Sequence, residues 1–128
     1  MSIRIEVAPG EIIDKLTILE IKRARIGDDT KRANVAHEWD VLTRDLDAVV
    51  KPTPELEALR TKLKEINEKL WVIEDDIRDC ERAKDFGETF IALARAVYFT
   101  NDERALVKRQ INELLGSSIM EEKSYAAY

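Results

Sequence analysis

The sequence predicts an all-α fold, an antiparallel helical bundle of about five helices with one long heptad-patterned helix and a short N-terminal strand-like arm. Hydrophobic residues make up 45% of the 128 residues and charged residues 37%, while only four Gly and three Pro interrupt the chain. That combination is typical of helices with one apolar and one polar face. Apolar residues also recur at spacings of three and four. The length is that of one domain, and we expect residues 1–128 to form one.

The first residues predict an extended arm. Ile3, Ile5 and Val7 alternate with charged residues, and this period of two indicates a strand-like segment over 1–9. Pro9 ends it. A strand this short needs a partner, which the rest of the chain does not obviously offer, so the arm would pair with a copy of itself or lie across helices.

A very apolar helix follows over about 11–26, with Gly27 in the stop position. Its apolar residues cover most of its circumference, so we expect it to be central. Helical projection places Glu20 and Arg23 inside the apolar arc, where charges must be paired or functional.

The next two helices are predicted over about 30–50 and 54–84, separated by "KPTPE". Thr53 followed by Pro54 is a typical helix start. The longer helix carries an unbroken apolar stripe at heptad spacing: Leu56, Leu59, Leu63, Ile66, Leu70, Ile73, Ile77 and Cys80. Such a helix would be ~45 Å long, far beyond the ~14 Å radius of gyration of a domain this size. Either another long helix lies beside it or it packs on a second chain, and we expect a homodimer with coiled-coil-like packing.

The C-terminal part predicts two further helices. The segment 88–99 has apolar residues at helical spacing, and "TNDE" from Thr100 to Glu103 matches a capping box that would open a fifth helix ending before Gly116. We expect 117–128 to be a mobile tail.

Composition excludes several classes of function. The net charge is −5 and basic residues are interleaved with acidic ones, so nucleic acid is not an expected partner. The single cysteine fits a reducing compartment. No signal peptide is recognisable, and the longest apolar stretch, interrupted by Arg95, is too short to span a membrane. We therefore expect a soluble cytoplasmic protein.

The acidic stretch "LWVIEDDIRDCE" does not place its carboxylates on one face. Its heptad phase assigns Asp75 and Asp79 to solvent. One stripe flanks the apolar seam at spacings of four and three, formed by Asn67, Trp71, Glu74, Arg78 and Glu81. The stripe is either a solvated face with one partly buried Trp, or a groove where a neighbouring helix covers Trp71 and brings charges from Arg23, Arg95 or Arg104 to grip a small anionic or hydroxylated molecule.

A second candidate region lies at the predicted helix corner near Thr100. Asn101 and Asp102 follow two aromatic residues, and Arg104 and Lys108 share one face. Polar side chains at such corners serve either ligand binding or chain reversal. The sequence favours neither alternative.

Particular residues argue against several specific enzyme classes. A two-metal helical pyrophosphatase needs paired acidic motifs, but Ile77 stands where Glu74 would need its carboxylate partner, so we expect no metal site. A helical chorismate mutase would place Arg where Gly10 stands. His37 has no catalytic motif around it, Cys80 falls at a core position, and no phosphate-binding Gly-rich loop is present. We expect no cofactor.

Three segments carry a resemblance to a known family. "LWVIEDDIR", "VYFTNDERALVKRQIN" and "EEKSY", together with the opening "GEIIDKLTILEIK", resemble small bacterial proteins classed as a domain of unknown function, over nearly the whole chain. The resemblance implies no activity and no functional residues. The context it implies is that of accessory factors of glycosyltransferases and surface-polysaccharide synthesis.

Two hypotheses remain. The first is a non-enzymatic module that dimerises or docks a protein partner through the long seam. The second is a small helical enzyme or ligand-binding protein with a site beside Trp71, lined by Glu20, Glu74 and Arg78.

Overall fold

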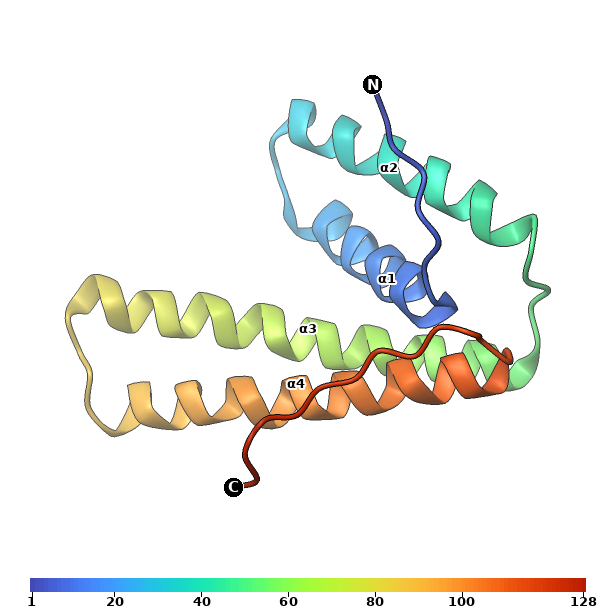
Figure 1. The fold of residues 1–128 in the computed structure, drawn as a ribbon. Coiled ribbons are helices and arrows are strands. Elements are labelled where there is room, and N and C mark those ends of the chain that lie inside the picture. The colour runs from blue at the N-terminus through green and yellow to red at the C-terminus, as the bar shows by residue number, and fades with distance from the viewer.

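The computed structural model describes all 128 residues and contains four helices and no strand. They are α1 (Pro9–Arg25), α2 (Asp29–Asp47), α3 (Pro54–Ala83) and α4 (Glu88–Leu114) (Figure 1). The predicted all-α class is confirmed, whereas the predicted fifth helix and strand-like arm are wrong. No helix is both long enough and apolar enough to cross a membrane.

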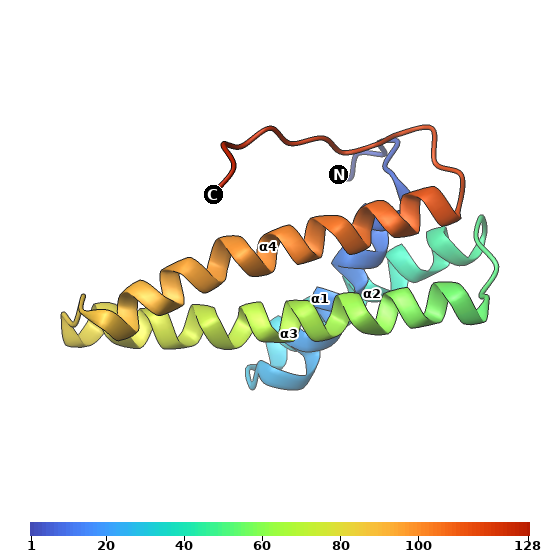
Figure 2. The same ribbon diagram turned by 90° about the horizontal axis from the view of Figure 1, so that it is seen from below.

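Helix α1 is the centre of the fold, as its apolar circumference predicts. It packs against α2, α3 and α4, whereas the backbone of α2 approaches no helix other than α1. Figures 1 and 2 show α1 between α2 and the antiparallel hairpin of α3 and α4. The main core lies where these elements meet and is formed by Ile13, Leu16, Leu46, Leu56, Leu63, Ile66, Val107 and Ile111.

Helix α3 has the limits and inner face that the sequence predicts. Thr53 caps it, with its Oγ1 accepting a hydrogen bond from the Leu56 N–H at 3.2 Å, and Pro54 occupies the first turn. It ends where Lys84 adopts a left-handed conformation with φ of 54°. Every residue of the predicted apolar stripe is buried or half-buried, and α4 lies alongside.

Helix α4 runs without interruption through the predicted boundary at Thr100. The spacing of three and four continues across it, through Leu93, Val97, Thr100, Arg104, Val107 and Ile111. Thr100 is 1% exposed, so its side chain faces the hairpin and does not cap a helix. A capping box contributes only about 1 kcal/mol, less than the packing of a continuous helix against α3. The long neighbour that α3 needs is therefore α4 of the same chain.

The N-terminal arm is extended but pairs with nothing. Ile3 and Ile5 are 81% and 75% exposed. Their alternation satisfies the pattern of a strand, but an all-helical fold offers no sheet edge on which the arm could form backbone hydrogen bonds.

The hairpin extends well past α1. At ~1.5 Å per residue, α1 is ~25 Å long and α3 is ~45 Å long, so α1 covers only the half of the hairpin that holds the core (Figure 1). We call residues 70–103 the outer hairpin. Only Ile73, Cys80 and Thr100 are buried in it, because two helices alone cannot enclose a core.

Gly10 allows the close approach of α1 to α4. A Cβ atom at this position would lie 2.6 Å from the carbonyl oxygen of Lys108 and 2.8 Å from Asn112 Oδ1. These distances are too short for any real contact, and a backbone carbonyl cannot turn aside as a flexible side chain can.

We expect Gly10→Ala to lower the free energy of unfolding by roughly 1–3 kcal/mol, the usual cost of overpacking, measured by urea denaturation. Gly27→Ala is the matched control, since no atom lies within 4 Å of its added Cβ, and its effect should stay within about 0.5 kcal/mol. Equal effects of the two substitutions would show that the α1–α4 contact is not tight.

Candidate functional site

A buried carboxylate joins the three packed helices. Asp14 on α1 is 1% exposed. Its Oδ1 accepts hydrogen bonds from Asn67 Nδ2 at 2.9 Å and from Arg104 Nε at 3.0 Å, and its Oδ2 accepts one from Arg104 Nη2. Arg104 therefore holds the carboxylate through both oxygens, the strongest geometry available to such a pair. The hydrogen bond from Arg104 to Asp14 raises the already high pKa of the guanidinium despite partial burial.

The Asn67 amide extends this network. Its Nδ2 also donates to Thr17 Oγ1 at 2.9 Å, and the Thr17 hydroxyl donates to the Asp14 backbone carbonyl at 2.8 Å. Each donor has an acceptor, as burial of polar groups requires. Because both oxygens of Asp14 are committed to hydrogen bonds, this carboxylate is not free to act as a base or nucleophile. Its role is to hold α1 on the hairpin.

Lys108 lies next to this network and faces a cavity. Its Nζ lies 2.8 Å from Glu11 Oε2 and 2.9 Å from Glu121 Oε2, and its side chain is only 10% exposed. Burial disfavours the charged amine, but the hydrogen bonds to the two glutamates and the charge of Asp14 outweigh burial and raise the Lys108 pKa. One α4 lysine is thus shared between the first turn of α1 and the C-terminal tail.

The tail, residues 117–128, lies along α4 (Figure 2). Glu122 Oε1 is 3.1 Å from Arg109 Nη1, and Lys123 Nζ is 2.7 Å from Asp102 Oδ1. Tyr128 donates a hydrogen bond to Asp102. The hydrogen bonds from Lys123 and Tyr128 lower the pKa of the Asp102 carboxyl. The contacts are ionic along the tail and aromatic at its end, where the Tyr128 ring packs on Tyr98 and Phe99.

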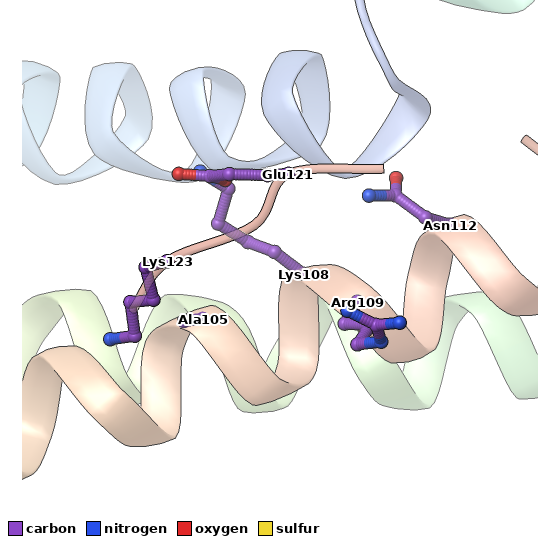
Figure 3. A pocket seen from close by; sticks show the side chains of 6 residues that line it. All are labelled: Ala105, Lys108, Arg109, Asn112, Glu121 and Lys123. Atoms are coloured by element: carbon purple, nitrogen blue, oxygen red, sulfur yellow. The ribbon is translucent and has the colours of Figure 1, made fainter. Parts of the chain in front are cut away.

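A cavity of about 30 Å³ lies between the tail and α4. Figure 3 shows Lys108, Arg109 and Asn112 approaching it from α4, and Glu121 and Lys123 from the tail. Asn112 is 2% exposed, and its Oδ1 accepts a hydrogen bond from the Gly10 N–H at 2.7 Å.

Glu20 belongs to a separate cluster between α1, α2 and α3. Its Oε2 accepts hydrogen bonds from Trp39 Nε1 at 3.1 Å and from Arg60 Nη2 at 3.0 Å, and its Oε1 lies 3.4 Å from Lys64 Nζ. Burial would raise the pKa of this carboxyl, but the two hydrogen bonds and the two cations lower it below the ordinary 4.5. The predicted need for a partner is met by residues that the sequence did not single out.

The ten predicted site residues fall in several places. Asn67 and Arg104 meet at Asp14, and Asp102 meets the tail. Arg23 is exposed, with its guanidinium carbon 5.9 Å from the centre of the Trp39 ring. Glu74 and Arg78 form an exposed ion pair, and the exposed Glu81 pairs with Lys84. Trp71 and Asn101 are half-buried.

No hydrogen bond or ion pair joins Glu20 to Glu74 or Arg78. Nowhere do three or more His, Cys, Asp or Glu side chains gather in the arrangement of a metal site. The predicted Trp71 site therefore remains a prediction without support from Glu20.

Sequence reasoning missed Asp14, Thr17 and Asn112. The signal for Asp14 was present, since it lies in the apolar segment of α1 where a charge needs a partner. The sequence places Lys108 on one face with Arg104, but it predicts a helix start there, whereas both residues lie in the middle of a long helix that packs on α1.

The fold and this site define an all-helical protein in which a central helix is fixed to a long hairpin by a buried Asp–Arg–Asn network. The chain belongs to a family of unknown function, DUF6165, whose model matches residues 3–128. No curated protein and no solved structure matches it. The predicted resemblance to a domain of unknown function is confirmed.

We expect Asp14→Ala to lower the free energy of unfolding by roughly 3–5 kcal/mol in urea titrations, because it leaves the half-buried Arg104 charge and the Asn67 amide without their acceptor. Asp75→Ala is the control, as this exposed residue of α3 forms no ion pair, and should change stability by less than about 0.5 kcal/mol. A small loss at Asp14 would contradict its role in holding α1.

Glu20 should make stability depend on pH. Its pKa in the folded chain is below 4.5, so its charge stabilises the fold above that value and this contribution is lost as the pH falls through the folded-state pKa. Wild type should exceed Glu20→Gln in unfolding free energy at pH 7, and the difference should shrink below pH 4.5, measured by urea denaturation at both ends. A constant difference would contradict the assignment.

Proposed function

We propose that the protein is a non-enzymatic docking module that forms a homodimer through the outer hairpin. The observation that carries this proposal is the incomplete burial of the hairpin's own inner face. Leu70, Trp71, Phe90, Leu93 and Val97 are only half-buried, although equivalent positions nearer α1, such as Leu63 and Ile111, are 0% exposed.

The outer hairpin also displays apolar side chains directly to solvent. The large exposed ones are Val72, Phe86, Ile91, Tyr98 and Phe99, each 39–55% exposed. Similar exposed apolar residues occur on the arm, α2 and the tail, so these side chains add to the surface that a partner could cover but do not by themselves mark an interface.

The total accessible surface supports the same conclusion. It is 9,068 Å², whereas a compact monomer of 14.7 kDa is expected to expose about 6,900 Å². The excess of about 2,100 Å² is larger than the roughly 800 Å² that each partner contributes to a standard interface. The arm, the tail and the outer hairpin all contribute to it.

Helical phase supports an interface on the side of the hairpin that α1 occupies further along. On α3, Asn67 faces α1, and steps of four, three and four lead to Trp71, Glu74 and Arg78. On α4, the same stepping back from Lys108 leads through Arg104 and Asn101 to Val97 and Ala94. No third helix of the chain covers the side of the outer hairpin between these two rows (Figure 1), and we call this side the groove.

A second copy of the chain is the occupant we propose. Its outer hairpin would supply two antiparallel helices of the same length, and two such hairpins form a four-helix arrangement with a shared core. A two-fold interface brings the same patch of each copy together, so Trp71 would be covered by the groove of its partner. The apolar stripe of α3, from which the sequence predicts a dimer, packs against α4 of the same chain. The proposed dimer therefore uses the groove beside that stripe.

The ligand-binding alternative beside Trp71 has less support. The Glu20 carboxylate is held by Arg60, Lys64 and Trp39, and Glu74 and Arg78 are engaged with each other on an exposed surface. We retain the cytoplasmic location from composition and the setting in surface-polysaccharide synthesis from the resemblance, as part of this proposal.

We expect a mass of twice 14.7 kDa by sedimentation at about 100 μM, and Ala94→Arg should shift the chain to monomer because it adds bulk and charge to the groove without removing an apolar contact. Ala92→Arg, on an exposed position of the same helix, is the control and should remain dimeric. Circular dichroism checks that both keep their helices. A wild-type monomer at this concentration, or equal behaviour of the two variants, would refute the proposal, and a protein partner would then be the alternative occupant.

A further inference from the structure

The tail, residues 117–128, is held on α4 by side chains alone. No backbone group of residues 118–128 forms a hydrogen bond with a helix. The tail side chains that contact α4 are 38–73% exposed, and they are those of Glu121, Glu122, Lys123 and Tyr128. An exposed ion pair contributes little to stability, and each residue that becomes ordered loses conformational freedom. The docked and released states of the tail are therefore close in free energy.

Opposite charges fix the register of the tail as it runs back along α4 (Figure 2). Glu122 Oε1 lies 3.1 Å from Arg109 Nη1. The next residue carries the opposite charge, and Lys123 Nζ lies 2.7 Å from Asp102 Oδ1. A shift of the tail by one residue would place Glu122 against Asp102, and the opposite shift would place Lys123 against Arg109. Because like charges repel, only one register is favourable.

The end of the tail closes on Asp102 and on two aromatic residues of α4. The centre of the Tyr128 ring lies 5.4 Å from that of Tyr98 and 4.7 Å from that of Phe99, and such aromatic pairs contribute more than the area they bury. The Tyr128 hydroxyl donates a hydrogen bond to Asp102 Oδ2, and Lys123 Nζ donates one to Oδ1 of the same carboxylate. Asp102 thus accepts both hydrogen bonds that residues 123–128 form with α4.

The tail leaves α4 at a residue suited to a hinge. Gly116 has a φ of 65°, and a Cβ added there would meet no atom within 4 Å, so the chain is not packed at this point. Release of the tail breaks none of the hydrogen bonds of Asp14. Lys108 keeps its partner Glu11 when Glu121 leaves. The tail can therefore detach without loss of the helical fold.

We propose that the tail is a releasable strap, that Asp102 is its latch, and that its release uncovers the aromatic side chains of Tyr98 and Phe99. These two rings are 42% and 39% exposed beside the docked tail, and they lose the cover of Tyr128 when it leaves. Ionic strength sets the state of the strap, because salt screens exposed charge pairs far more than buried ones.

The strap does not depend on the proposed dimer. Successive residues lie about 100° apart around a helix. Tyr98 and Asp102 are therefore on a different side of α4 from their neighbours Val97 and Asn101, which line the groove. A monomeric chain would still close and release its strap.

Reversal of one charge on the tail tests the latch. Lys123→Glu places a like charge against Asp102 and should release the strap, and the backbone order parameters of residues 119–128 in 15N NMR relaxation should fall below about 0.6, the range of flexible backbone. Asp102→Lys in the same chain restores opposite charges and should return the order parameters to the wild-type values. NaCl on the order of 1 M, where the Debye length is ~3 Å, should lower them in the wild type.

Lys51→Glu is the matched control, because it makes the same change of charge at an exposed residue that forms no ion pair, and it should leave the tail as in the wild type. Circular dichroism checks that every variant keeps its helices. Equal order parameters of the tail in the wild type and in Lys123→Glu would overturn the proposal. A double variant whose tail stays released, or a control that releases it, would overturn it as well.

Discussion

The bidentate bond between Asp14 and Arg104 is the interaction on which the rest of the structure depends. These residues lie 90 positions apart in sequence, and their contact fixes α1 against α4 while Asn67 fixes it against α3. Apolar packing is non-directional and would tolerate rotation or sliding of a helix as apolar as α1. A guanidinium that donates to both oxygens of a carboxylate allows only one relative orientation. The Asp14–Arg104 pair therefore selects the rotation of α1 that also places Gly10 against the Lys108 carbonyl and Glu11 beside the Lys108 amine.

Such a network selects a structure more than it adds stability. Removal of an Asp carboxylate from water costs several kcal/mol, which its partners roughly offset. Only 21 of 128 residues are buried, so the apolar core is small and the contribution of each ordered contact to the net stability is large. The chain therefore combines a modest core with a directional polar clamp, and the clamp decides which faces of α1 meet which helix.

The features that could be predicted from sequence are those set by local pattern. The limits of α3 follow from Thr53, Pro54 and an apolar stripe that matches one period over its whole length. The boundary predicted at Thr100 failed because a capping motif and a continuous period conflict there, and long-range packing against α3 decides between them. The predicted strand in the N-terminal arm is wrong for a different reason. The alternation of apolar and charged residues fits a strand, but the fold contains no other strand with which it could pair.

The site could be predicted only in part. The sequence indicates Asn67 and Arg104 as members of two other candidate regions. Their contact with Asp14 depends on how three helices cross, and the spacing of residues along one helix carries no information about that crossing. The same holds for Lys108 and the tail, whose contact depends on a chain reversal after Gly116. Its positive φ of 65° marks the point where the chain leaves α4.

The attachment of α2 has a consequence for the order in which parts of the chain open and close. Its backbone approaches α1 alone, and only Val35 and Leu46 are buried along its length. Release of α2 uncovers the core at Leu46 but breaks none of the hydrogen bonds of Asp14, so we expect its amide protons to exchange with solvent through a local opening below the global unfolding free energy. On the same grounds we expect the slowest-exchanging amides to be those of α1, α3 and α4 around Asp14, and α2 to open separately from them.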